Sequence, residues 1–288
     1  MTVQHWKLAR RTLAYGERTL VMGVLNVTPD SFSDGGQFFS IDKALAHAEQ
    51  MISEGADIID IGGESTRPGS EFVPEAEEMR RVLPIIERVA SAASIPISID
   101  TTKSSVARAA LEAGAEIVND ISGLRFDPSI ADEVAKTKAG LILMYSRGTP
   151  KDMQQLPPVD DIVSEVIGGL RGSVTIAEAR GVNREAIAID PGLGFGMSGA
   201  QNVEVIAKLV EIVRAFADLP LMIGPSRKSF LGKLLDGAPA NKRLYGTIAS
   251  VTASVMNGAH IVRVHDVQAA VEAVRVVDAV VSVVSKDS

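Results

Sequence analysis

The chain contains no cysteine, only 4% aromatic residues and no excess of basic charge. Without cysteine there is no disulfide, no thiolate nucleophile and no cysteine-ligated zinc or iron–sulfur site. The 29 basic and 36 acidic residues give a net charge of -7, so no overall basic face is offered to nucleic acid or to an anionic membrane. We therefore expect small-molecule substrates, and neither nucleic acid nor a membrane, as partners.

Long hydrophobic runs are missing as well. No run of about 18 apolar residues is present, so the sequence predicts no membrane-spanning helix. Residues 1–6 (MTVQHW) are polar and do not resemble a signal peptide, which leads us to expect a cytoplasmic protein. A chain of 288 residues, 46% of them hydrophobic, can still bury a sizeable core.

Short β-branched runs recur along the whole chain and indicate buried strands. They have no polar alternation, which is typical of parallel strands covered on both faces. The eight runs are residues 20–25, 57–61, 96–99, 116–118, 141–144, 186–189, 221–223 and 261–264. Helical periodicity fills the intervals, as in residues 41–52, 82–89 and 203–213, and Pro84 predicts a kink or a late helix start.

Eight strand–helix alternations without a break in composition predict the α/β class, and within it a (β/α)8 TIM barrel. The alternative is an open doubly wound sheet. We expect a single domain, with residues 1–18 as a short N-terminal extension that caps the bottom of the barrel and residues 19–288 as the barrel itself.

Polar residues follow each predicted strand, where a barrel places its active site. Four cations from separate segments, Arg67, Lys228, Arg263 and His265, suit a pocket for phosphate oxygens. A lone arginine is better explained as a solvated loop cation, and His265 alone is equally well explained as a supporting residue, but four such residues from separate segments favour the pocket. Asn26, after the first strand, suits Mg²⁺, which takes few protein ligands.

Asp100, Asn119 and Asp190 each end a predicted strand. Buried carboxylates are costly unless they meet hydrogen-bond donors, and a flat heterocycle with several N–H groups would supply them. The alternative is that these side chains cap the helices that follow. Met144 and Phe195 would give the ring an apolar face, or simply belong to the core.

Six segments of the chain resemble dihydropteroate synthase, in that family's order. They are NVTPDSFSDGG (residues 26–36), GGESTRPG (62–69), SIDT (98–101), DPGLGFG (190–196), SRKSFLG (226–232) and RVHDV (263–267). The resemblance extends over about residues 20–280 and implies a TIM barrel, a homodimer and Mg²⁺ as cofactor. It also implies a transferase of folate biosynthesis that joins 6-hydroxymethyl-7,8-dihydropterin diphosphate to p-aminobenzoate and releases pyrophosphate.

The resemblance further implies a role for each matching residue. Asp100, Lys228 and Arg263 would be catalytic. The pterin would contact these three together with Asn119, Ile121, Met144, Asp190, Phe195 and Gly224. The diphosphate would bind Asn26, Thr66, Arg67, Arg263 and His265, with Asn26 also touching the metal. The p-aminobenzoate site, where sulfonamides compete in this family, would use Thr66, Arg67, Pro68, Lys228 and Ser229.

Two departures from the family pattern stand near these motifs: Met197 replaces a frequent lysine, and Tyr145-Ser146 replaces a frequent His-Met pair. Three other functions are compatible with parts of the pattern. They are a corrinoid-linked methyltransferase on the same barrel, a Schiff-base aldolase with Lys228 as nucleophile, and a pterin-binding protein without turnover. We also expect the long loops after the first two strands to close over the site and exclude water.

Overall fold

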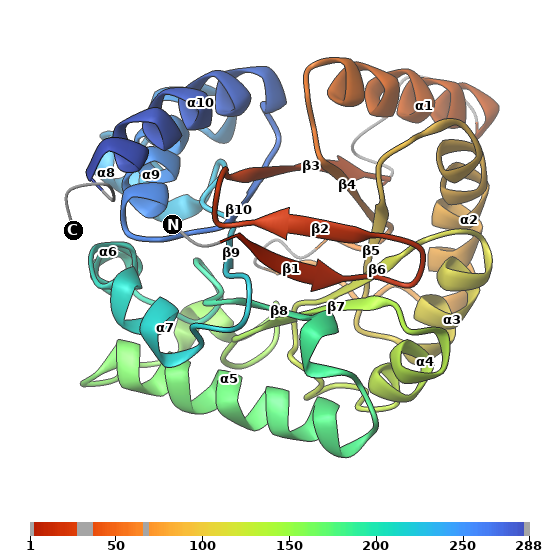
Figure 1. The fold of residues 1–288 in the computed structure, drawn as a ribbon, viewed down its shortest axis with the longest axis horizontal. Coiled ribbons are helices and arrows are strands. Elements are labelled where there is room, and N and C mark those ends of the chain that lie inside the picture. Colours follow the sequence, from red (N-terminus) through yellow and green to blue (C-terminus); the bar gives the residue numbers. More distant parts are fainter. Residues whose placement is uncertain (1–2, 28–36, 66–68, 285–288) are drawn as a thin grey trace.

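The computed structural model describes residues 3–27, 37–65 and 69–284, and eight parallel strands form its centre (Figure 1). Their order around the sheet is β8-β7-β6-β5-β4-β3-β10-β9. A parallel bridge between Ile189 and Leu221 then joins the two ends of this sheet. The sheet is therefore closed, which confirms the predicted TIM barrel and excludes the open sheet.

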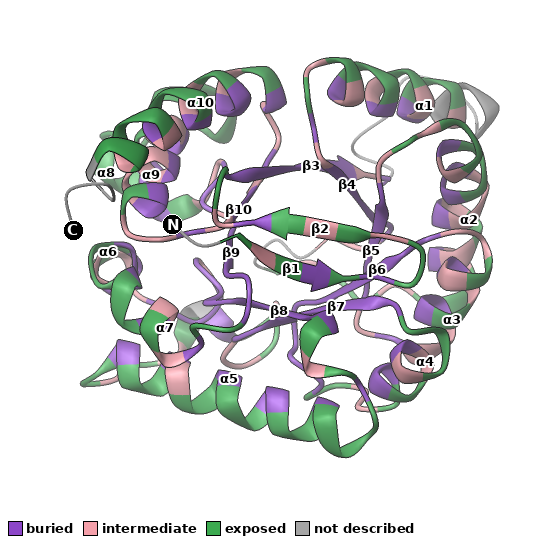
Figure 2. Ribbon diagram, in the orientation of Figure 1, coloured by how far each residue is buried: buried purple, intermediate pink, exposed green. Residues whose placement is uncertain are grey.

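All eight predicted strands are present, with ends shifted by one or two residues. They are β3 (Leu20–Asn26), β4 (Ile58–Gly62), β5 (Ile97–Asp100), β6 (Ile117–Asp120), β7 (Gly140–Met144), β8 (Ile187–Asp190), β9 (Met222–Ile223) and β10 (Ile261–Val264). Nearly every residue in them is buried, as expected for strands that face the barrel interior on one side and helices on the other (Figure 2).

Helices form the outer ring of the barrel and turn their polar faces outward (Figures 1 and 2). They are α1 (Gln37–Ser53), α2 (Glu75–Ala92), α3 (Ser104–Glu112), α4 (Ile130–Thr137), α5 (Ile162–Ala179), α6 (Gly199–Ala207), α7 (Leu209–Ala215), α8 (Ser229–Leu234), α9 (Leu244–Met256) and α10 (Val267–Val284). Within the described segments, none of these helices combines the length and hydrophobicity needed to cross a bilayer.

Two helix predictions differ from the structure. Helix α2 begins at Glu75 and contains Pro84, which excludes a late start at the proline and leaves the alternative of a kink. The periodic segment 203–213 is not one helix, because Lys208 leaves helical geometry and separates α6 from α7. The apolar spacing continues across this break since both helices pack their buried faces on the same core.

The N-terminal segment forms an antiparallel hairpin of β1 (Gln4–Lys7) and β2 (Thr12–Tyr15). The hairpin lies across one end of the barrel (Figure 1). Its buried side chains Trp6, Leu8 and Tyr15 belong to the same cluster as Leu20 and Ile58, the first residues of two barrel strands. It therefore covers the N-terminal end of the strands, opposite the end where an active site forms.

We expect Trp6→Phe to lower the free energy of unfolding by about 1–3 kcal/mol, because a buried acceptor loses its donor. The Trp6 indole Nε1 is fully buried and donates to the Ala186 carbonyl at 2.8 Å. Urea denaturation measures the loss. The matched control is Lys7→Ala on the same strand, which removes a solvent-exposed ion pair with Glu185 and should have little effect. Equal effects of the two substitutions would contradict the anchoring role of Trp6.

Candidate active site

A narrow cleft lies at the C-terminal end of the barrel strands. Its lining residues are Asp100, Asn119, Ile121, Met144, Asp190, Leu193, Phe195, Met222, Gly224, Lys228 and Arg263. All of the residues predicted to contact the pterin are in this set. They come from six different strands or the loops that follow them, namely β5, β6, β7, β8, β9 and β10. Leu193 and Met222 are lining residues that sequence reasoning did not include.

A buried ion-pair network forms the charged side of the cleft. The Arg263 guanidinium donates through Nε to Asp60 at 2.6 Å and through Nη2 to Asp100 at 2.7 Å. Asp60 is fully buried and also accepts from Asn119 Nδ2 at 3.1 Å. Arg263 is thus paired with two carboxylates, and its expected role in binding the diphosphate stays a prediction.

Sequence reasoning missed Asp60. It lies in the middle of β4, whereas the site residues were sought only among the polar residues that follow each strand. The available signal was a carboxylate inside the apolar run Ile58-Ile59-Asp60-Ile61, because such a group must be paired when it is buried.

Burial changes the protonation of three cleft residues. It raises the pKa of Asp100 to about 7, although Arg263 opposes this shift, and the pKa of Asp190 to about 6. It lowers the pKa of Lys228 to about 8, with repulsion by Arg263 acting in the same direction. Three groups in one cleft therefore change charge near neutral pH, a property that is typical of functional sites.

The alternative that Asp100 and Asn119 cap helices does not hold. Both line the cleft, where Asp100 accepts a hydrogen bond from Arg263 and Asn119 donates one to Asp60. Asp120 forms the local turn instead, since its carboxylate accepts from the backbone N–H of Ser122 and Leu124 at 2.8 and 2.7 Å.

The loop after β8 is folded tightly against the loop after β7. The Asp190 carboxylate accepts from Gly192 N at 2.7 Å, which holds the carboxylate toward the cleft. Gly192 has a φ of +74°, and a Cβ at this position would lie 1.8 Å from the Tyr145 carbonyl oxygen, so no other residue fits.

The apolar side of the cleft is a small cluster of Ile121, Met144, Met153 and Phe195. The Lys228 ammonium lies 4.1 Å from the centroid of the Phe195 ring, a cation–π contact. An aromatic ligand in this cleft would meet an apolar surface with Lys228 at its edge.

His265 lies beside the cleft without lining it. Its Nδ1 is 3.0 Å from Ser226 Oγ, and burial together with the positive charges of Arg227 and Arg263 lowers the pKa of His265 to about 3. These surroundings favour the neutral imidazole over the cation expected from the sequence, and the diphosphate-binding role of His265 stays a prediction. Ser229 begins α8 and is exposed, next to Lys228.

Thr66, Arg67 and Pro68 lie outside the described residues, and so does segment 28–36. The predictions for these residues, including closure of the two long loops over the site, stay predictions. The described residues on either side of 66–68 are hydrogen-bonded to other parts of the chain. Gly69 N donates to the Pro150 carbonyl at 3.0 Å, and Arg81 Nη1 on α2 donates to the Gly63 carbonyl at 2.9 Å.

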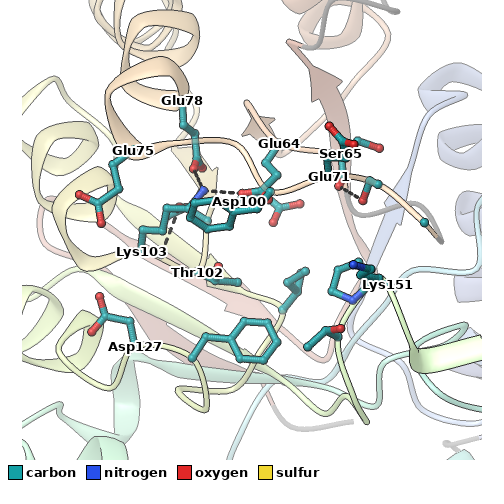
Figure 3. Close-up of a pocket in the computed structure, with 18 residues that line it drawn as sticks. Glu64, Ser65, Glu71, Glu75, Glu78, Asp100, Thr102, Lys103, Asp127 and Lys151 are labelled. Carbon is teal, nitrogen blue, oxygen red and sulfur yellow. Dashed lines mark hydrogen bonds and ion pairs between the residues drawn. The ribbon is translucent and has the colours of Figure 1, made fainter. Parts of the chain in front are cut away.

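A second, larger cavity of about 780 Å³ adjoins the cleft and shares Asp100 and Ile121 with it (Figure 3). Buried Lys103 stands on its wall and forms ion pairs with Glu64 and Glu78, as the dashed lines show. The Lys103 ammonium also donates to the Val73 carbonyl at 2.7 Å. Through these contacts Lys103, which follows Asp100 in the chain, is bound to Glu64 and Val73 on either side of residues 66–68.

Among the described residues, no group of three or more His, Cys, Asp or Glu side chains is arranged to hold a metal. Asn26, at the end of β3, offers a single amide oxygen beside Gly62. One oxygen ligand fits an Mg²⁺ ion that keeps its waters and is held mainly by substrate phosphates, and it does not fit a metal caged by the protein.

The two departures from the family pattern lie outside the residues that line the cleft. Met197 is buried and belongs to the main hydrophobic core, where a lysine would be costly. Ser146 Oγ accepts from Arg125 Nη2 at 2.8 Å, outside the residues that line the cleft.

Comparison with known proteins assigns the barrel and its cleft to the pterin-binding enzymes: the family model described as "Pterin binding enzyme" matches residues 22–265. The dihydropteroate synthase of Synechocystis is 48% identical over 265 residues, which are 92% of this chain and 91% of that protein. The chain belongs to the dihydropteroate synthase family, whose members are transferases of folate synthesis.

Solved structures agree with this assignment. Dihydropteroate synthase of Yersinia pestis, in complex with a sulfonamide drug, is 42% identical with a TM-score of 0.90, over 97% of this chain and 100% of that one. The Xanthomonas albilineans enzyme with 4-aminobenzoic acid is 42% identical with a TM-score of 0.89, over 97% of this chain and 98% of that one.

Proposed function

We propose that this chain condenses 6-hydroxymethyl-7,8-dihydropterin diphosphate with p-aminobenzoate to give 7,8-dihydropteroate and pyrophosphate. The observation that carries the proposal is the cleft, in which hydrogen-bond acceptors from two strands face an apolar wall and a network of buried charges. A flat, donor-rich ring with an anionic substituent matches this arrangement.

The pterin ring would lie between the apolar cluster and the charged network. Asn119 and Asp190 would accept hydrogen bonds from ring N–H groups, and Lys228 would donate to a ring acceptor. Gly224 lines the cleft without a side chain and leaves room for the ring at the end of β9.

The reaction would begin with cleavage of the bond between the pterin methylene carbon and the diphosphate oxygen, whose electron pair leaves with pyrophosphate. Positive charge then develops on the methylene and the ring, and the Asp100 carboxylate beside them stabilises it. The neutral arylamine nitrogen attacks the methylene carbon, and its proton passes to the departing pyrophosphate or to water. No nucleophilic side chain takes part, so rate acceleration comes from positioning and electrostatics.

The diphosphate would bind at the rim formed by Asn26, Thr66, Arg67, Arg263 and His265, with neutral His265 acting through an N–H group. Mg²⁺ held by the diphosphate, water and Asn26 would supply positive charge against the pyrophosphate. The p-aminobenzoate would bind beside Lys228 and Ser229, and Thr66, Arg67 and Pro68 would also contact it.

The homodimer and the cytoplasmic location also belong to this proposal. Exposed apolar side chains on α9 and α10, namely Met256, Val276, Val280 and Val283, support a subunit interface on that side of the barrel. Val276, Val280 and Val283 recur at a spacing that places them on one face of α10.

The affinity for the pterin is expected to fall as the pH falls below about 6, where the Asp190 carboxylate takes up a proton. A protonated carboxyl group accepts hydrogen bonds poorly, so a ring N–H group loses its partner. Calorimetric titration of the pterin between pH 5 and 8 checks this. Asp190→Asn is the control, because it cannot titrate and should lose this part of the pH dependence; an unchanged slope in the variant would contradict the assignment.

Competing substrates test the proposed function against its main alternative. The two ligands, dihydropterin diphosphate with Mg²⁺ and methyltetrahydrofolate, are titrated separately into the protein. The proposal predicts that the diphosphate binds more tightly and is converted to dihydropteroate when p-aminobenzoate is added. Preference for methyltetrahydrofolate would indicate a methyl-group carrier instead.

A further inference from the structure

Asp60 does not line the cleft, yet it contacts two residues that do. Its Oδ2 atom accepts from Asn119 Nδ2 at 3.1 Å and from Arg263 Nε at 2.6 Å. Asp60 is fully buried in β4, and Arg263 and Asn119 come from β10 and β6. One carboxylate oxygen therefore holds donors from two other strands in place.

The chemistry of this contact decides how the Asn119 amide is oriented. A carboxylate paired with arginine only accepts hydrogen bonds, so Asn119 must turn its NH₂ group toward Asp60. The amide oxygen is then directed elsewhere, and Asn119 Oδ1 is buried without a hydrogen-bond partner among the described residues. An unpaired buried acceptor is costly unless a ligand supplies the missing donor.

We propose that Asp60 is a positioning residue that fixes the Asn119 amide with its oxygen toward the cleft and so selects a ring that presents an N–H group there. This inference rests on the proposed function, because the ring is the pterin of the synthase reaction. Asp60 acts through Asn119 and Arg263 and touches no substrate itself.

The test compares two substitutions of similar size. Asp60→Asn can keep an oxygen toward Asn119 and Arg263, whereas Asp60→Leu offers no acceptor and leaves the Asn119 amide free to turn. We expect Asp60→Leu to raise the calorimetric Kd and the KM for the pterin diphosphate by about 10- to 100-fold. The KM for p-aminobenzoate should stay unchanged, and Asp60→Asn should remain close to the wild type.

Equal losses in the two variants would overturn the inference, because Asp60 would then act only through its charge. An unchanged Kd in Asp60→Leu would overturn it as well. Failure of the wild type to form dihydropteroate is a different result, which contradicts the proposed function while the binding comparison still tests Asp60.

A second pair of variants decides the matter if Asp60→Leu does not fold. Asn119→Asp places two carboxylates side by side, and neither can donate. In the double variant Asp60→Asn, Asn119→Asp, the amide introduced on β4 can donate to the carboxylate introduced on β6, whose other oxygen faces the cleft. We expect the double variant to bind the pterin diphosphate about tenfold more tightly than Asn119→Asp alone. Equal or weaker binding would refute the inference.

Discussion

Replacing Arg263 with alanine is expected to lower the free energy of unfolding by about 3–5 kcal/mol, because removal of one partner leaves buried charges uncompensated. Arg263 is the shared partner of Asp60, which is fully buried, and of Asp100, which is 9% exposed. Without the guanidinium both carboxylates stay in a low-dielectric interior and lose the ion pair that the structure gives them. Urea denaturation at pH 7 measures the loss.

The pH dependence of this loss gives the control. In the alanine variant the folded-state pKa of Asp100, which burial already raises, rises further because Arg263 no longer opposes the shift. Folding then takes up protons, and the variant regains stability as the pH falls. The deficit should shrink as the pH falls toward 7 and change little below that, where Asp100 is protonated in the folded wild type as well. Arg263→Lys keeps a positive charge and should lose less stability, and a loss in Arg263→Ala as small as in the lysine variant would contradict the account.

Asp100→Asn is expected to lower kcat by about 100- to 1000-fold, the usual cost of removing one group that stabilises transition-state charge. The amide oxygen can still accept from Arg263, whose Nη2 lies 2.7 Å from the Asp100 carboxylate, so the fold should survive. What the variant lacks is the negative charge beside the developing cation.

Steady-state rates and thermal melting together check this prediction. The melting temperature should stay near that of the wild type while turnover falls. The affinity for the pterin should fall far less than kcat, because the charge acts mainly in the transition state. An unchanged kcat would remove Asp100 from the mechanism.

Most of the barrel could be predicted from the sequence because each strand is a short apolar run that is followed by polar residues. Ile97–Asp100 is an example: its buried run ends at the carboxylate that enters the cleft. The hairpin of residues 4–15 could not be predicted in the same way, because its strands are short and mix buried with exposed residues. Its buried side chains Trp6, Leu8 and Tyr15 pack on the strand ends of the barrel, a contact between distant parts of the chain.

The cleft residues could be named from the motifs, but their charges could not. The sequence alone suggests that His265 is a cation. Its burial next to Arg227 and Arg263, which only the structure reveals, lowers its pKa and favours the neutral form. Arg263 reads as an anion-binding residue, and only the packing of β4 against its neighbours reveals Asp60 as its second partner. Pairing between strands that are far apart in the chain decides both cases.

Pyrophosphate release tests the central claim most directly. Purified protein is given the dihydropterin diphosphate and Mg²⁺, with and without p-aminobenzoate, and pyrophosphate and dihydropteroate are both quantified. The account predicts that release depends on p-aminobenzoate and yields dihydropteroate in equal amount. Tight pterin binding without release, or release without dihydropteroate, would contradict it.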